Sequence, residues 1–202
     1  AETAQDEIES TLRITVLNPD DHIRQDVYLF VNVDHCTWRE EYIDSKYKYI
    51  YFYRVKDKYG EFSNFYPPSD DVDKAEKFRL FIKGKSWKTT EHFYQAMKFE
   101  GLPQEDEVRN AKNAYWAAKL GNKLSPIRED WNKVKDNVMY EAVFAKFNQN
   151  EDLKELLLNT DNAMLIEHTK NDSYWADGGD GSGLNKLGKI LMKVREKLRN
   201  ES

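Results

Sequence analysis

One stretch in the middle of the chain constrains the fold more than any other: residues 87–101, which read WKTTEHFYQAMKFEG. Its apolar residues Phe93, Ala96 and Met97 recur at spacings of three and four, so they share one face of a helix. A threonine precedes the first turn and can cap the helix, and Gly101 ends it. The sequence therefore predicts an amphipathic helix whose apolar face packs into a core.

The same helix carries a second, polar stripe. Glu91, Gln95 and Lys98 stand at positions i, i+4 and i+7, and Glu91 falls in the first turn. There the positive end of the helix dipole favours an ionised carboxylate. From the residues alone, a solvated surface stripe is the simpler interpretation.

Charge is distributed unevenly along the 202 residues, which suffice for one large domain or two small ones. Residues 1–48 hold 5 Lys/Arg and 11 Asp/Glu, whereas residues 49–202 hold 26 and 25. The acidic excess thus lies in the N-terminal quarter. No strongly basic field exists to bind duplex nucleic acid by neutralising phosphates. We expect any nucleic-acid contact to be local and directed at one nucleotide.

Cysteine and histidine usage excludes several classes of site. The lone Cys36 allows no internal disulfide and no Cys-based zinc site, and the four histidines lack metal-ligand spacing. No apolar run reaches membrane-spanning length, and no signal-peptide core is present. The sequence predicts an intracellular, cytoplasmic protein, with the nucleus as the alternative compartment, that binds no metal, no cofactor and no membrane.

The acidic residues 1–48 are predicted as an N-terminal extension with short strands. Runs rich in β-formers occupy 12–17 and 27–33, and the turn-forming segment Asn18-Pro19-Asp20-Asp21 separates them. Residues 38–46 are charged and form a short helix or a loop in this interpretation.

Residues 49–202 are predicted as a single α+β domain, mainly helical, with a small antiparallel sheet. Outside the helix described above, the patterns predict strands at 47–55 and 164–169, a hairpin over 78–87 turning at Gly84-Lys85, a loop at 60–68, and helices at 105–120, 131–147, 151–158 and 184–198. Gly121 closes the first of these helices, and Ser125-Pro126 signals the start of the next. The last helix has a buried stripe of Leu184, Leu187, Leu191, Val194 and Leu198, and Gly188 allows a close crossing.

A glycine-rich loop, NDSYWADGGDGSG at residues 171–183, precedes the last helix. It fits neither the dinucleotide-binding fingerprint nor a calcium loop, and the Lys189-Ile190 pair does not complete a P-loop. Backbone amides freed by glycine at a helix start can still cradle a phosphate. An ordinary tight loop with capping aspartates is an equally good interpretation.

Four blocks occur in order along the chain: YFYRVKDKYGEFSNFYP, KSWKTTEHFYQAMKF, DWNKVKDNVMYEAVFAKFNQN and LIEHTKNDSYWADGGDGSGLNKLGKILMKVR. Together they resemble the YbiA-like family, also called NADAR (NAD- and ADP-ribose-associated) domains. The resemblance covers roughly residues 50–199 and leaves residues 1–48 outside. One departure is Ala176 in Trp-Ala-Asp, where family members often have glycine.

The resemblance implies an N-glycosidase that cleaves the bond between ribose C1 and an exocyclic amine. Two substrate types are linked to the family: ADP-ribose on the guanine amino group, and phosphoribosylamino intermediates of riboflavin synthesis. The first is expected here, with ADP-ribose or ADP-ribosylated guanine, as nucleoside or in nucleic acid, as the partner. A module that binds ADP-ribose or NAD without turnover is the alternative from another class.

Departure of an amine from an anomeric carbon passes through an oxocarbenium-like state. It needs a carboxylate near the ribose and an acid near the leaving nitrogen. Glu91 is the first candidate for the ribose side and Asp172 the second carboxylate. Lys98 and Lys146 are candidate acids, or a lysine could form a Schiff base with the open-chain sugar.

The remaining candidates bind substrate. Rings that could stack on a base and polar groups that could bond ribose or phosphate are taken from the matched blocks. They are Arg54, Phe62, Ser63, Asn64, Tyr66, Trp131, Trp175, Asp177, Gly181, Gly183 and Asn185. Core packing is an equally good interpretation for Trp131.

Overall fold

The structure is a computed structural model that describes residues 9–18, 23–32, 37–39 and 48–201. The chain divides into two compact units. The first holds residues 1–50 with 162–164, and the second holds 51–161 with 165–202. The predicted boundary between residues 48 and 49 stays a prediction, and each unit is described by itself.

The first unit is built on an antiparallel hairpin. Strand β1 (Glu9–Asn18) pairs with β2 (Ile23–Asn32) along its whole length, and β3 (Thr37–Arg39) pairs with the end of β2. The start of β2 also pairs with Tyr49 and Ile50 of β4 (Tyr49–Phe52). The two predicted strands are confirmed and are longer than expected. Of the predicted helix or loop at 38–46, residues 38 and 39 belong to β3, and the rest lies outside the described residues.

The second unit is mainly helical with a small antiparallel sheet, as the sequence predicted. Its helices are α1 (Val72–Lys77), α2 (Thr90–Ala96), α3 (Pro103–Arg109), α4 (Ala114–Lys123), α5 (Trp131–Asn148), α6 (Glu151–Leu158) and α7 (Lys186–Asn200), with 3-10 turns η1 (Gly60–Phe62) and η2 (Met97–Phe99). Strands β5 (Leu80–Ile82) and β6 (Lys85–Trp87) form the small sheet, and β7 (Met164–Glu167) precedes the glycine-rich loop. None of the described helices is long and apolar enough to cross a membrane.

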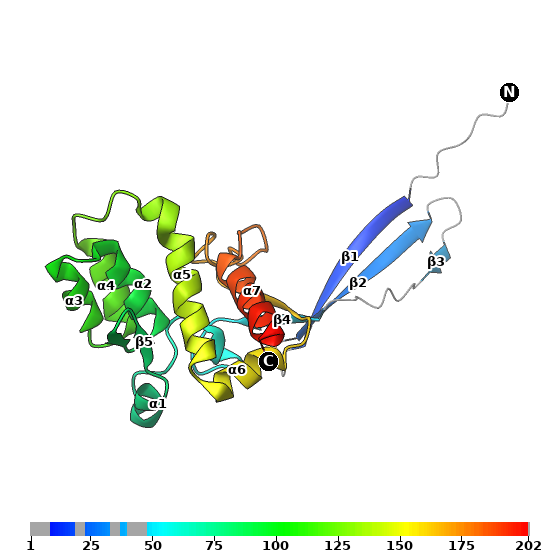
Figure 1. The fold of residues 1–202 in the computed structure, drawn as a ribbon. Coiled ribbons are helices and arrows are strands. Elements are labelled where there is room, and N and C mark those ends of the chain that lie inside the picture. The colour runs from blue at the N-terminus through cyan, green and yellow to red at the C-terminus, as the bar shows by residue number, and fades with distance from the viewer. Residues whose placement is uncertain (1–8, 19–22, 33–36, 40–47, 202) are drawn as a thin grey trace. The chain divides into compact units, whose positions relative to one another are not determined.

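Helix α2 occupies the centre of this unit. It contacts α3, α4 and α5, and α5 runs between this group and α7 (Figure 1). The side chain of Thr89 caps α2 by accepting a bond from the N–H of His92 at 3.3 Å. Phe93, Ala96 and Met97 are buried as predicted, and Phe93 packs edge-on against Trp87 with ring centroids 5.1 Å apart.

The polar stripe of α2 is buried as well. Glu91, Gln95 and Lys98 are 7%, 6% and 7% exposed, so the interpretation as a solvated surface stripe is wrong. A short helix enclosed by three neighbours has no face left for solvent. Its charged groups must instead find partners inside the protein.

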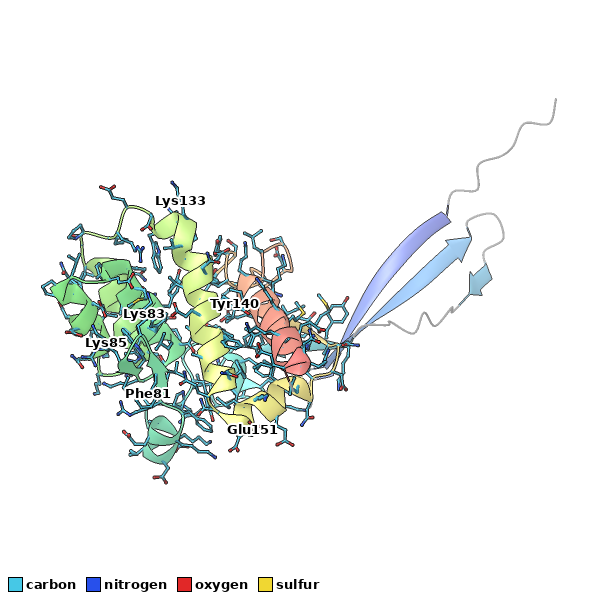
Figure 2. The ribbon with its side chains drawn as sticks, viewed as in Figure 1. Phe81, Lys83, Lys85, Lys133, Tyr140 and Glu151 are labelled. Atoms are coloured by element: carbon cyan, nitrogen blue, oxygen red, sulfur yellow. The ribbon has the colours of Figure 1, made fainter. Side chains whose placement is uncertain are left out.

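Helix α7 matches its predicted pattern more closely. Leu187, Leu191, Val194 and Leu198 are buried, whereas Leu184 precedes the helix and is 47% exposed. A Cβ at Gly188 would lie 2.0 Å from the carbonyl oxygen of Leu165, so only glycine permits this approach of α7 to β7. On the neighbouring α5, the ring of Tyr140, labelled in Figure 2, lies 4.8 Å from the ammonium of Lys193.

Two predicted helix boundaries are wrong. The single helix expected at 105–120 is two helices, because the side chain of Asn113 accepts from the N–H of Trp116 at 3.1 Å and starts α4. Gly121 lies inside α4, where a Cβ would come within 2.1 Å of Gln95 Oε1. This glycine serves the contact between α2 and α4, and it does not end the helix.

The helix start expected at Ser125-Pro126 is also wrong, whereas the helix predicted at 131–147 is confirmed as α5, which begins at Trp131. The N–H of Arg128 donates to the carbonyl oxygen of Lys98 at 2.9 Å, which holds this segment against the end of α2 as an irregular strap. Local helix signals are overridden where the main chain has a tertiary partner.

The hairpin expected over 78–87 is confirmed as β5 and β6, but it turns one residue earlier, at Lys83-Gly84. Both turn residues have left-handed backbone angles, with φ of 52° and 71°. Lys83 pairs with Glu100 and Lys85 with Glu105, and both lysines are labelled in Figure 2. These ion pairs fix the hairpin beside the end of α2.

Candidate active site

A cavity of about 890 Å³ opens in the second unit. Six segments line it: the residues after β4, the loop at 63–69, α1 with the residue before β5, the start of α2, the start of α4, and the end of β7 with the loop that follows. Chain segments that are far apart in sequence meet here, as is usual for a ligand site. Three of the predicted site residues, Arg54, Ser63 and Asp172, are in its wall.

Glu91 lies in the first turn of α2, between Thr89 and His92, which both line the cavity. Its main-chain N–H donates to the carbonyl oxygen of Asn64 at 3.0 Å, and its Oε1 accepts from Gln95 Nε2 at 2.8 Å. The carboxyl group is thus held on two sides, by the loop before α2 and by its own helix.

Burial raises the pKa of Glu91 to about 7. The bond from Gln95 and the charge of Lys98 lower this pKa, and the charge of Asp172 raises it. The helix dipole was expected to keep this carboxylate ionised, but desolvation outweighs it. A carboxyl group with a pKa near neutrality can take up or release a proton at physiological pH.

Asp172 lines the cavity from the glycine-rich loop. Its Oδ1 accepts from the main-chain N–H groups of Tyr174 and Trp175, both at 2.7 Å. These two donors fix the orientation of the carboxyl group. Its Oδ2 has no hydrogen-bond partner among the residues that the structure describes, and is available to a ligand.

Glu167 is a cavity-lining carboxyl group that the sequence analysis missed. Its main chain is fixed by bonds to Asn185 Oδ1 at 3.1 Å and from the N–H of Asp177 at 2.9 Å. Burial, together with the charges of Asp172, Glu91 and Asp177, raises the pKa of Glu167 to about 8. The signal in the sequence was a glutamate ending an apolar strand five residues before Asp172.

Asp172 and Glu167 line the cavity, and Glu91, which is buried and is not among the lining residues, interacts electrostatically with both. No group of three His, Cys, Asp or Glu side chains in the described part of the chain is arranged to hold a metal ion. We refer to these three residues as the acidic wall.

Residues 51–199 match the NADAR domain family. The chain belongs to the NADAR family. The N-glycosidase YbiA of Escherichia coli (strain K12) is 44% identical over 153 residues, which cover 75% of this chain and 89% of that protein. A riboflavin biosynthesis protein of Vibrio vulnificus is 38% identical over 154 residues, which cover 76% of this chain and 39% of that protein.

The fold agrees with this assignment. The NMR structure of Escherichia coli YbiA superposes with a TM-score of 0.65 at 42% sequence identity, covering 76% of this chain and 86% of that one. With relatives of this similarity named as N-glycosidases, the chain is an enzyme, a glycosidase that hydrolyses N-glycosyl compounds.

The two lysines of this NADAR domain that were predicted as acids bond to main-chain oxygens. Lys98 Nζ donates to Gly121 O at 3.0 Å and to Asn122 Oδ1 at 3.1 Å, and burial lowers its pKa. Lys146 Nζ donates to Ser63 O at 2.8 Å, and burial lowers its pKa to about 7. Neither lysine lines the cavity, but Lys98 interacts electrostatically with Glu91, and Lys146 holds the loop that carries Ser63.

Trp131 and Trp175 of the NADAR domain gather around Tyr94 behind the acidic wall. Their ring centroids lie 5.0 and 5.4 Å from that of Tyr94. Trp131 is 9% exposed, and the ammonium of Lys98 lies 5.9 Å from its ring. This cluster packs against the elements that carry the acidic wall.

Phe62 and Tyr66 are in the core, 1% and 4% exposed, where Phe62 packs edge-on against Phe52. The rings that line the cavity are Tyr53, Phe65 and Tyr115, which are 40%, 38% and 54% exposed. Sequence analysis did not select these three for stacking. Their signal was exposure, which only the folded chain reveals.

The glycine-rich loop is organised from within by Asp177. This carboxylate is 5% exposed, with Oδ2 at 2.7 Å from His168 Nδ1 and Oδ1 accepting from the N–H of Gly179 at 2.9 Å. A Cβ at Gly183 would lie 2.5 Å from the carbonyl oxygen of Ala176, and Gly181 has a φ of 84°. These predicted binding residues shape the loop that presents Asp172.

Asn185 and Asn64 hold the main chain at Glu167 and at Glu91. Asn185 Nδ2 donates to Leu165 O at 2.9 Å while its Oδ1 accepts from the N–H of Glu167, so its amide joins the start of α7 to β7. Asn64 is 8% exposed, and its carbonyl oxygen accepts from Glu91. Ala176, the departure from the family pattern, is buried and does not have a positive φ.

Proposed function

We propose that the chain hydrolyses the bond between ribose C1 and the exocyclic amine of an ADP-ribosylated guanine, releasing ADP-ribose. The observation that carries the proposal is the acidic wall: Asp172 and Glu167 line the cavity, Glu91 interacts with both, and the surroundings give the two glutamates different pKa values. Such pairs of titratable groups divide the roles of acid and base between them.

Each group of the acidic wall has a role in this proposal. Asp172, fixed by two N–H donors, stabilises the positive charge that develops at C1 and the ring oxygen. Glu91, with a pKa of about 7, takes a proton from the attacking water. Glu167, with a pKa of about 8, is protonated at pH 7 and donates its proton to the leaving nitrogen.

The atoms and electrons balance across this step. The water oxygen forms a bond to C1 as the C1–N bond breaks, and the electron pair of that bond passes to nitrogen. The nitrogen gains the proton of Glu167, and Glu91 gains the proton of water. Return of a proton from Glu91 to Glu167, directly or through solvent, restores the starting state.

The dimensions and lining of the cavity support a nucleotide-sized substrate. A volume of about 890 Å³ is at the upper end for small-molecule sites. The exposed rings of Tyr53, Phe65 and Tyr115 offer stacking surfaces for a base. The near-neutral charge of residues 49–202 suits a single nucleotide better than a long duplex.

A second candidate is hydrolysis of phosphoribosylamino intermediates of riboflavin synthesis. The match to a riboflavin biosynthesis protein of Vibrio vulnificus favours it. The two candidates share the bond that is broken and differ in the leaving amine.

The deciding experiment incubates the protein with an oligonucleotide and a nucleoside that carry ADP-ribose on guanine, and in parallel with the phosphoribosylamino-pyrimidine. Products are measured by liquid chromatography and mass spectrometry. Release of free ADP-ribose from either guanine substrate is expected. Inertness on both, with turnover of the pyrimidine, would replace the first candidate by the second.

A further inference from the structure

The cavity has a second charged side, opposite in sign to the acidic wall. Arg79, Lys88 and Lys112 line it and come from three different segments: the residue before β5, the residue after β6, and the residue two before α4. We refer to these three residues as the basic side. Neither the substrate-binding residues chosen from the sequence nor the acidic wall includes them.

Lys88 is half-buried, and its ammonium donates to the carbonyl oxygen of Ala111 at 2.7 Å. Burial and then the nearby charge of Arg79 lower its pKa. No carboxylate of the described residues lies within ion-pair distance of Lys88. Two cations are thus held close together at a cavity, and Lys88 has no anion of its own.

Arg79 is held in a fixed direction. Its Nε and Nη2 donate to the two carboxylate oxygens of Glu76 at 2.9 and 2.7 Å, which leaves the third nitrogen, Nη1, without a bond to Glu76. A guanidinium positioned in this way can offer its remaining N–H groups to a phosphate.

Lys112 follows Ala111, whose carbonyl oxygen accepts the bond from Lys88 and lies 3.3 Å from His92 Nε2. This shared oxygen brings the chain around Lys112 next to Lys88. The side chain of Lys112 is exposed, and within the described part of the chain no carboxylate pairs with it. Its long stem is therefore free to bring its ammonium to an anion.

The basic side and the acidic wall have different charged neighbours. The charge acting on Lys88 is that of Arg79, whereas those acting on Glu167 are the charges of Asp172, Glu91 and Asp177. A substrate that fits both sides has an anionic group at one end. At its other end, positive charge develops in the transition state. A phosphorylated ribosylamine has this character.

We propose that Lys88, Lys112 and Arg79 form a subsite that binds a phosphate group of the substrate. The inference rests on the proposed function, because the subsite belongs to the same cavity. The phosphate has two sources of the same chemistry: the pyrophosphate of ADP-ribose, or the 5′-phosphate of a phosphoribosylamine.

The test measures binding of ADP-ribose, ribose 5-phosphate and inorganic phosphate by isothermal titration calorimetry. It compares the wild-type chain with Lys88→Gln, Lys112→Gln and the double variant. Lys123→Gln is the matched control, since Lys123 is an exposed lysine of α4 outside the cavity. Melting curves confirm folding, and the exposed Lys112 gives a variant that leaves the core intact.

We expect the double variant to bind the phosphorylated ligands about tenfold more weakly or worse, since each lost contact is a charge-assisted bond. Lys123→Gln should bind like wild type. A larger loss for ADP-ribose than for ribose 5-phosphate assigns the subsite to the pyrophosphate, and equal losses assign it to the 5′-phosphate. Equal affinities in the double variant and the control, or no binding of either phosphorylated sugar to wild type, overturn the inference.

Failure of the subsite and failure of the proposed function remain distinguishable. If the guanine substrate is hydrolysed but the double variant keeps the wild-type KM, the subsite is wrong and the function stands. If phosphate binding depends on the two lysines but no guanine substrate is hydrolysed, the subsite stands and the function is wrong.

Discussion

Helices α2 and α7 both carry charged residues at helical spacing, and most of those on α7 are exposed, with Arg195 as a buried exception, whereas the charged residue on α2 is buried. On α7 the charged Lys189, Lys193 and Glu196 are exposed opposite a buried apolar stripe. Glu91 of α2 and Lys98 of the following turn η2 are as buried as the apolar residues beside them.

The difference shows what burial adds to a pattern. A charged stripe facing water stabilises a helix weakly and costs little. A charged stripe inside the protein loses its hydration and must be retained for some other reason. On α2 the result is a carboxyl group with a pKa of about 7 next to a cavity, which is useful for proton transfer.

The largest expected effect is on catalysis. Glu91→Gln keeps the size of the side chain but removes the group that takes a proton from water, so kcat should fall by about 100-fold or more. Hydrolysis of the guanine substrate at pH 7.5 measures it, together with the affinity for ADP-ribose, which should change little. The matched variant on α7, Glu196→Gln, should keep the wild-type rate. Equal rates in both variants would remove Glu91 from the mechanism.

The next effect is on the alkaline side of the pH profile. Glu167 must be protonated to act as acid, so activity should fall as pH rises above its pKa of about 8. Glu91 must be ionised to act as base, so activity should fall as pH drops below about 7. Wild type should therefore show a maximum between these values.

Glu167→Gln should lower kcat by roughly 10- to 100-fold and abolish the alkaline limb, while the acid limb stays. Rates from pH 5.5 to 9.5 measure both limbs. Persistence of the alkaline limb in this variant would assign that limb to another group, and Lys98 is the first to consider.

The comparison of α2 with α7 also explains which features the sequence revealed. Periodicity predicted both helices, the stripe of α7 and the hairpin before α2, because those elements follow local rules. It predicted the range of α5 but missed the break at Asn113, and its helix-start signal at Ser125-Pro126 was wrong, because caps and tertiary bonds decide at these places. Glu91 and Asp172 were selected through the resemblance, whereas Glu167 and the basic side emerge only when β7 and the start of α4 meet at one cavity.

The comparison can be tested by measuring how substitution of two glycines changes the free energy of unfolding. A Cβ at Gly188 of α7 would lie 2.0 Å from the main-chain oxygen of Leu165, whereas at Gly121 the obstacle is the side chain of Gln95. Gly188→Ala should therefore destabilise the fold more, by about 3 kcal/mol, and Gly121→Ala by about 1 kcal/mol. Urea unfolding measures both.

The pH profile of activity also distinguishes the two glycine variants, because each glycine contacts the support of a different carboxyl group. A Cβ at Gly188 would displace Leu165 O and the amide of Asn185, which hold Glu167 in place, so a change in the folded fraction of Gly188→Ala should appear in the alkaline limb. Gly121→Ala moves Gln95, which donates to Glu91, and should raise the pKa seen in the acid limb. Identical pH profiles for the two variants would contradict the proposed coupling between Gln95 and Glu91.

The smallest expected effect separates two roles for Lys98. Its positive charge lowers the pKa of Glu91, so Lys98→Met should move the acid limb upward by about 0.5–1 pH unit. The matched Lys189→Met on α7, where the lysine is exposed, should leave the profile unchanged. The pH dependence of kcat measures the shift. Loss of turnover at every pH, together with a wild-type adduct trapped by borohydride and absent from Lys98→Met, would instead show that Lys98 attacks the sugar as a Schiff base. The buried stripe of α2 and η2 would then supply the nucleophile as well as the carboxylate. Burial of its charged residues would serve covalent catalysis as well as the tuning of a pKa.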